Sequence, residues 1–239
     1  MYNLGWYCLF NYITRAISDG SFDTLSFLSY LLSTLAVIFI TMPIHEWAHG
    51  YVSTKLGDPT PRMQGRLTLN PMAHIDWLGA AGIMLFGIGW ANPVKVNARY
   101  YKNPKWGMVL VAFAGPFANL ILSLVTMVLS YLFILISSTV TYFISNFLFY
   151  IAYISTYLAV FNMIPIPPFD GSRILFAFLP QKYYFKIMQY ERYIFIGLMA
   201  LFLLDNRTGI ISGTIGYVSG KVLYFIAIIA KFPFNLFGV

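Results

Sequence analysis

Long apolar stretches separated by short polar segments define the organisation of this 239-residue chain. Crossing the hydrocarbon core of a bilayer takes about 20 mostly apolar helical residues. Three stretches reach that length, and we expect them to span at about Leu25–Lys55, Trp106–Ile136 and Thr141–Ile164. Two further apolar stretches, near Tyr193–Leu204 and Ile210–Ala230, predict two additional C-terminal spans.

Three other segments have patterns of their own. Arg66–Leu69 alternates polar and apolar residues, which predicts a short strand. The apolar stretch Trp77–Trp90 is too short and too rich in glycine for an ordinary span. It is better interpreted as a re-entrant or interfacial element whose backbone is covered by protein or lines a cavity. The aromatic-rich residues 1–20 predict a short interfacial or partly inserted segment.

The composition supports a membrane protein. Hydrophobic residues make up 59% of the chain and charged residues only 10%, whereas a soluble domain is about a quarter charged. We therefore expect an all-α polytopic membrane protein forming one domain over residues 1–239, with a core at about 25–180 and C-terminal helices at about 188–235. The single Cys8 excludes an intrachain disulfide and a cysteine-based metal cluster.

Basic residues gather in two of the predicted loops. The net charge of +7 comes from side chains between apolar segments, a distribution that orients membrane helices and does not indicate nucleic-acid binding. Seven lie between the first two spans, four follow the third, and the turn between the second and third has none. They are Lys55, Arg62, Arg66, Lys95, Arg99, Lys102, Lys105, Arg173, Lys182, Lys186 and Arg192. Both basic loops are therefore expected on the cytoplasmic side.

The first span carries the motif His45-Glu46-Trp47-Ala48-His49 near its loop end. Residues four apart share one face of a helix, so His45 and His49 can bind one metal ion. Imidazole is a common ligand of Zn²⁺, and Glu46 can take a proton from metal-bound water. A structural role for buried histidines is the alternative. The pattern predicts a zinc hydrolase site within the membrane, nearer its cytoplasmic side.

A catalytic zinc usually has three protein ligands and an open position, so one further ligand is expected. Asp170 follows a proline-rich break at the cytoplasmic end of the third span, where an acid is costly unless it is paired or metal-bound. Alternatively, Asp170 caps the helix expected at Ser172–Leu179. His74, in the polar loop before Ile75, is the rival third ligand, and a structural or gating role fits it equally well.

Two asparagines lie in apolar surroundings. Asn119 and Asn162 can hydrogen-bond neighbouring helices, as amides in membranes often do. They can instead orient a substrate carbonyl or stabilise an oxyanion. The adjacent Gly115-Pro116 indicates a helix kink or a close helix–helix contact.

Three motifs together resemble the site-2 protease family of intramembrane zinc metalloproteases, peptidase family M50. They are H45-E-W-A-H49, G115-P-F-A-N119 and N162-M-I-P-I-P-P-F-D170-G171. The resemblance covers roughly residues 27–180. It implies that Asp170 is the third ligand of one zinc ion per chain, that Glu46 activates water, and that Asn162 assists the scissile carbonyl. The chain looks like a compact member without a PDZ or CBS domain, and Phe169 stands where the family often has leucine.

The resulting expectation is an integral protein of the cell membrane that hydrolyses peptide bonds in or near transmembrane segments of other proteins. Its partners would be a transmembrane protein or peptide and membrane lipid, without nucleic acid. One alternative is a catalytically silent metal-binding regulator, although the intact Glu46 argues against it. A zinc transporter is less consistent with the sequence, because only one cluster of ligands is present.

Overall fold

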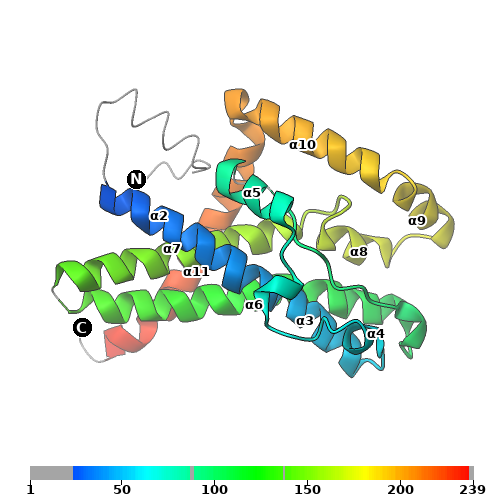
Figure 1. Ribbon diagram of the computed structural model, residues 1–239, viewed down its shortest axis with the longest axis horizontal. Coiled ribbons are helices and arrows are strands. Elements are labelled where there is room, and N and C mark those ends of the chain that lie inside the picture. The colour runs from blue at the N-terminus through cyan, green and yellow to red at the C-terminus, as the bar shows by residue number, and fades with distance from the viewer. Residues whose placement is uncertain (1–23, 87–88, 137, 237–239) are drawn as a thin grey trace.

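The computed structural model describes residues 24–86, 89–136 and 138–236, and over these residues it is helical, with no strand (Figure 1). The interfacial segment expected at residues 1–20, together with Cys8, lies outside this range. The all-α prediction is confirmed for the described part of the chain.

The first span is one long helical rod made of three consecutive elements. These are α2 (Thr24–Ala36), the π-helical turn η1 (Val37–Thr41) and α3 (Met42–Lys55), which carries the histidine motif. Pro43, at the start of α3, has no N–H and its ring would clash with the carbonyl four residues earlier in an α-helix. The wider π turn directly before it relieves this conflict, and such turns are frequent at functional sites.

Helices α6 (Pro104–Ile134) and α7 (Thr139–Asn162) form the antiparallel pair expected from the short turn between them (Figure 1). Hydroxyl groups join them. Ser123 Oγ donates to the Ala152 carbonyl at 2.8 Å, and Ser130 Oγ donates to the Ser145 carbonyl at 2.9 Å. Small and hydroxyl side chains allow close packing where lipid offers no hydrophobic driving force. Helix α3 packs on α6, and α2 packs on α7.

Four helices follow α7. They are α8 (Asp170–Phe176), α9 (Gln181–Met188), α10 (Glu191–Thr208) and α11 (Ile210–Leu236). Helix α11 lies against α6 and α7 (Figure 1). Their shared core consists of Met127, Ala152, Leu223, Ile226 and Ala230.

The reversal from α10 to α11 is tightly held. Gly209 adopts a left-handed conformation with φ of 65°, which glycine accepts without steric cost. The Asp205 carboxylate then accepts hydrogen bonds from Ile211 N and Ser212 N at 2.9 and 2.7 Å, satisfying two amides at the start of α11.

The described part of the loop between α3 and α6 contains four short helices. These are α4 (Thr60–Met63), η2 (Pro71–Ala73), α5 (Trp77–Phe86) and η3 (Ala98–Tyr100). The strand expected at Arg66–Leu69 is wrong, because its polar groups serve local turns: Thr68 Oγ1 accepts from Asn70 N, and the Thr68 carbonyl lies 2.8 Å from His74 Nε2. The expected re-entrant element is the ten-residue helix α5, too short to span a bilayer.

Four of the described helical segments are long and apolar enough to cross a membrane. Leu31–Lys55, Pro104–Ile134 and Thr139–Asn162 agree with the three predicted core spans, and Ile210–Phe234 agrees with the last one. The prediction of a second C-terminal span is not confirmed. Helix α10 has only 18 residues and includes Glu191, Arg192, Asp205 and Arg207, too many charges for a typical span.

Candidate metal centre and adjoining cavity

Three potential metal ligands from two distant parts of the chain meet at one point. His45 Nε2 lies 3.0 Å from His49 Nε2 and 3.1 Å from Asp170 Oδ2, and His49 Nε2 lies 3.2 Å from the same oxygen. All three side chains are buried or nearly so. Among the described residues they form the single group of three or more such ligands.

Helix α3 presents both histidines toward α6, and Gly115 makes this approach possible. A Cβ atom at position 115 would lie 2.3 Å from His49 Nε2 and 2.6 Å from His45 Nε2. Such distances are far inside van der Waals contact, so a side chain at this position would collide with the imidazole rings. The sequence indicated a close helix–helix contact at Gly115, and the structure confirms it.

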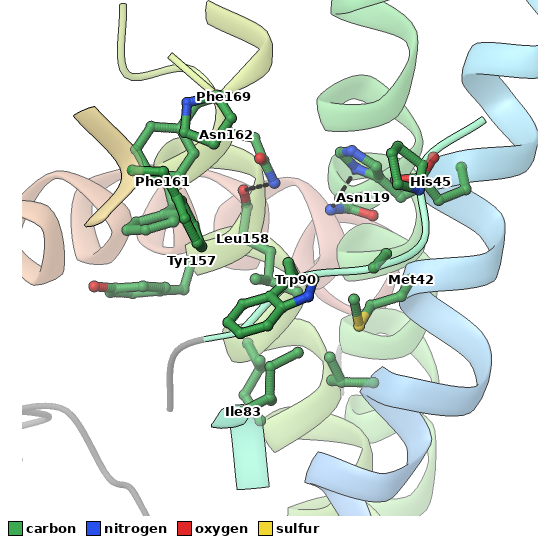
Figure 2. A pocket seen from close by; sticks show the side chains of 18 of the residues that line it. Met42, His45, Ile83, Trp90, Asn119, Tyr157, Leu158, Phe161, Asn162 and Phe169 are labelled. Atoms are coloured by element: carbon green, nitrogen blue, oxygen red, sulfur yellow. Dashed lines mark hydrogen bonds between the residues drawn. The ribbon is translucent and has the colours of Figure 1, made fainter. Parts of the chain in front are cut away.

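The other nitrogen of each histidine ring contacts helix α6. His49 Nδ1 lies 2.7 Å from the Val111 carbonyl oxygen, to which it can only donate. His45 Nδ1 lies 3.1 Å from Asn119 Nδ2, and Asn119 Oδ1 is buried without a hydrogen-bond partner (Figure 2). Exchanging the two ends of this amide would turn its oxygen toward His45 and remove the unpaired acceptor.

The donor set fits zinc. Two imidazole nitrogens and a carboxylate oxygen are typical ligands of a catalytic Zn²⁺, and ligand atoms around a tetrahedral zinc are separated by about 3.3 Å. The observed separations are 3.0 to 3.2 Å. Hydrogen bonds from the remaining ring nitrogens to carbonyl or amide oxygens fix the imidazole orientation in such sites.

Asp170 is the first residue of α8, and the chain around it is tightly packed. Phe169 is buried against Phe161, with ring centroids 4.4 Å apart. A Cβ on Gly171 would lie 2.2 Å from the Met163 carbonyl oxygen, so only glycine fits between α8 and the end of α7. Asp170 directs its carboxylate to the histidines, and no side-chain hydrogen bond caps α8. This geometry favours the ligand interpretation of Asp170 over the cap.

Glu46 is held by the backbone of an extended segment that follows α5. Val94 N donates to Glu46 Oε2 at 2.8 Å. The same segment is fixed on both sides: Asn92 N donates to the His74 carbonyl, and Asn97 N donates to Asp58 Oδ2, both at 2.7 Å. The carboxylate therefore sits at a defined position beside the histidines.

The anchor at Asp58 is a polar cluster in which Asp58 and Ser53 are fully buried. Its carboxylate also accepts from Ser53 Oγ at 2.7 Å and Thr60 N at 2.9 Å, and Ser53 Oγ lies 2.7 Å from Tyr101 Oη. Burial alone would raise the pKa of Asp58, but hydrogen bonds from Thr60, Asn97 and Ser53 lower it below its ordinary value. Burial raises the pKa of the Tyr101 hydroxyl. Asp58 is thus an anion that ties the end of α3 to the extended segment.

His74 does not join the metal cluster. Its side chain is fully buried, with Nε2 donating to the Thr68 carbonyl at 2.8 Å, and its carbonyl accepts from Asn92 N. These bonds fold the loop after α4 and hold the segment that reaches Glu46. The geometry favours the structural interpretation of His74.

A cavity of about 580 Å³ opens beside His45 and Glu46. Figure 2 shows His45 and Asn119 on one side and Asn162, Phe161 and Phe169 on the other, with Trp90 between them. Asn162 Nδ2 donates to the Leu158 carbonyl at 3.0 Å, which orients its amide at the cavity wall. The structure thus brings Asn162 to the cavity and Asn119 to the back of His45.

Three parts of this site were missed by sequence reasoning. The Val111 carbonyl and the Val94 amide are backbone groups, which carry no residue-type signal. Trp90 was assigned only to the apolar element before the basic loop, yet it lines the cavity and packs edge-on against Phe195 at 5.5 Å. Its position at the end of a glycine-rich apolar stretch was the one available signal.

Comparisons with known proteins agree with this geometry. Residues 132–204 match Peptidase family M50. The chain is 40% identical over 183 residues to "Putative zinc metalloprotease YwhC" of Bacillus subtilis (strain 168), covering 74% of this chain and 82% of the relative. It is 29% identical over 160 residues to "Putative zinc metalloprotease Rip2" of Mycolicibacterium smegmatis, covering 65% of this chain and 60% of that protein.

No solved structure matches the chain significantly. The family match, the extent of the similarity to the Bacillus protein and the three clustered ligands lead to one assignment. The chain belongs to peptidase family M50, the site-2 protease family, and is a zinc metalloprotease.

Proposed function

We propose that this protein cleaves peptide bonds in or next to transmembrane segments of other membrane proteins. The observation that carries the proposal is the cluster of His45 and His49, in a segment of membrane-spanning character, with Asp170, which follows another such segment, beside a largely apolar cavity. A substrate that reaches such a cavity from the bilayer is itself apolar.

The proposed ligands of the zinc ion are His45, His49 and Asp170. When bound, zinc supplies a Lewis acid that acidifies water and polarises a carbonyl group. Glu46 takes one proton of the attacking water and passes it to the leaving nitrogen. The water oxygen bonds to the carbonyl carbon as the C–N bond breaks. The hydrogen bond from Val94 N supports this role, because it holds the carboxylate by one oxygen.

The two asparagines have different proposed tasks. Asn119 acts as a positioning residue behind His45, supported by its 3.1 Å contact and its unpaired buried oxygen. Asn162 uses one amide hydrogen on the Leu158 carbonyl, which leaves the other for the carbonyl of the scissile bond. The substrate must be locally unwound, because a transmembrane helix pairs all its backbone groups internally.

The proposed setting is the cell membrane, with the metal centre toward the cytoplasm. Basic residues lie in the loops on the side of α3 that carries His49, and the turn between α6 and α7 has none. Residues 1–239 are proposed to act as one domain.

The direct test is cleavage by purified protein in detergent. Suitable substrates are synthetic peptides with one apolar span of about 20 residues and a central Asn-Pro or Gly-Ser break that loosens the helix. Wild-type protein should cleave them, a chelator should stop cleavage, and added zinc should restore it. Glu46→Gln should keep its zinc and lose at least about a hundredfold in kcat, because the proton acceptor is gone.

The same experiment separates the alternative functions. Full activity in Glu46→Gln would overturn the proposed role of this carboxylate. A zinc-loaded wild-type protein that binds the peptides without cutting them would instead support a silent metal-binding regulator. Movement of zinc across the membrane of sealed vesicles that contain the protein, without peptide cleavage, would support a transporter.

A further inference from the structure

The cavity beside the metal centre is lined by two chemically different kinds of side chain. Aromatic side chains form most of one wall, where Trp90, Tyr157, Phe161 and Phe169 surround the space (Figure 2). Three charged residues, Arg173, Glu191 and Arg192, also line the cavity. Apolar and aromatic walls accept large hydrophobic side chains, whereas a few polar groups fix the orientation of a ligand.

Arg173 lies close to the proposed metal ligands. It follows Asp170 by three residues in α8, and residues three apart share a helix face with Cβ atoms about 5–6 Å apart. Its side chain is only half-buried and lines the same cavity as His45 and Glu46. The guanidinium also counteracts the effect of burial on the Tyr101 hydroxyl pKa, which indicates that the two groups are near each other.

Among the described residues, no ion pair joins Arg173, Arg192 or Glu191 to any other side chain. Two arginines and two glutamates, Glu46 among them, thus line the cavity, and neither guanidinium is bound to a carboxylate among the described residues. An arginine fork binds a carboxylate through two parallel hydrogen bonds, and such bonds are strong where water is partly excluded.

We propose that Arg173 forms a subsite for a carboxylate of the substrate peptide close to the scissile bond. This inference rests on the proposed function, since it concerns the substrate of that same site. The carboxylate is either an Asp or Glu side chain in the unwound segment or the free C-terminus of a short peptide. The aromatic wall takes the apolar residues beside it.

The distance from Asp170 to Arg173 limits where the carboxylate can lie. One helical turn corresponds to about 5.4 Å, and an extended peptide advances about 3.3 Å per residue. The acidic group should therefore lie within about two residues of the scissile bond. A span whose break is flanked by an acid should be preferred over the same span with an amide.

Peptide binding to the Glu46→Gln protein tests this subsite without requiring cleavage. Matched fluorescent peptides would carry a Glu, Gln or Lys two residues before or after the central break. A second, shorter pair of peptides would end two residues after the break, one with a free C-terminal carboxylate and the other with a C-terminal amide. We expect the Glu peptide to bind about tenfold more tightly than the Gln peptide, as for a hydrogen bond to a charged group. Arg173→Gln should remove the difference, and Arg173→Glu should favour the Lys peptide.

The matched control is Arg62→Gln, which removes an exposed arginine on α4 that does not line the cavity. It should keep the full preference, and zinc content should be equal in all variants. A preference confined to the shorter free acid would identify the C-terminal carboxylate as the ligand. Equal binding of acid and amide peptides in every arm would overturn the subsite.

Cleavage by wild-type protein distinguishes the two proposals. Equal kcat/KM for Glu and Gln peptides would overturn the subsite and leave proteolysis intact. Arg173-dependent binding without any cleavage by zinc-loaded protein would overturn the proposed function and leave the subsite intact.

Discussion

At the scale of single residues, the site depends on side chains that are each held by more than one contact. His45 touches Asp170 through Nε2 and Asn119 through Nδ1, and His49 combines the cluster with the Val111 carbonyl. Contacts to both nitrogens of an imidazole fix the ring orientation and the nitrogen available to a metal. Such preorganisation means that losing one ligand should not be compensated by a neighbour.

Substitution of Asp170 should therefore lower the zinc content, whereas substitution of His74 should leave it unchanged. Asp170→Ala is expected to weaken zinc binding by more than about a hundredfold, since even outer contacts of a metal site are worth ten- to a hundredfold. His74→Ala should keep zinc and lose about 1 kcal/mol of stability with its hydrogen bond to Thr68. The zinc content per chain after dialysis reports metal binding, and the midpoint of thermal unfolding reports stability. Normal zinc in Asp170→Ala with loss in His74→Ala would make His74 the ligand.

At the scale of elements, close helix contacts decide whether the ligands can meet. Helix α6 approaches α3 where Gly115 lies against the two imidazole rings, and Gly171 lets α8 pack on the end of α7. The extended segment with Val94 is held to α3 through Glu46 and Asp58. These contacts hold the elements that carry the proposed metal ligands and Glu46. A steric change at one of them should therefore displace groups of the metal centre.

Adding one methyl group to α6 tests this coupling. Gly115→Ala would bring a Cβ to 2.3 Å from His49 Nε2, and overpacking typically costs about 1–3 kcal/mol. We expect lower thermal stability and at least about tenfold weaker zinc binding. The matched control is Gly220→Ala on α11, where a Cβ meets nothing within 4 Å. Because alanine favours helix more than glycine does, this control should retain zinc and gain up to about 1 kcal/mol. Equal zinc affinity in both variants would contradict the coupling.

At the scale of the whole molecule, the polar loops and the metal ligands lie toward one end of the apolar bundle. Seven of the fifteen Lys and Arg residues lie between Lys55 and Lys105, and the opposite turn between α6 and α7 carries none. Lys and Arg in short loops are retained on the cytoplasmic side. The arrangement predicts a single orientation in the membrane, with the loop end of α3 inside the cell.

Cysteine labelling in intact cells tests that orientation. In a Cys8→Ser background, Lys102→Cys should react with a membrane-impermeant maleimide only after the cells are permeabilised, since it lies in the basic loop. Val140→Cys, at the exposed start of α7, should react without permeabilisation. Labelling of both variants in detergent is the control for accessibility, and the reverse pattern would invert the proposed topology.

Periodicity and composition were sufficient for the three core spans and for the all-helical class, because membrane-spanning segments must satisfy their backbone internally and must be long and apolar. Periodicity and composition were less successful for segments that are short or that combine apolar and charged residues. Arg66–Leu69 alternates like a strand but has no partner strand, and its polar groups are used in local turns. Helix α10 is apolar in its middle and charged at both ends, so the prediction that it spans the membrane is not confirmed.

The histidine pair and its glutamate are local, because helical spacing alone brings His45 and His49 to one face. The sequence by itself therefore determined the kind of metal, the membrane setting and a short set of candidates for the third ligand. Only the tertiary structure brings Asp170 to the histidine pair and leaves His74 apart from it, because these distances depend on how α3, α6 and α8 pack. The same holds for Asn119 and the Val94 amide, since these contacts join residues separated by 48 to 125 positions.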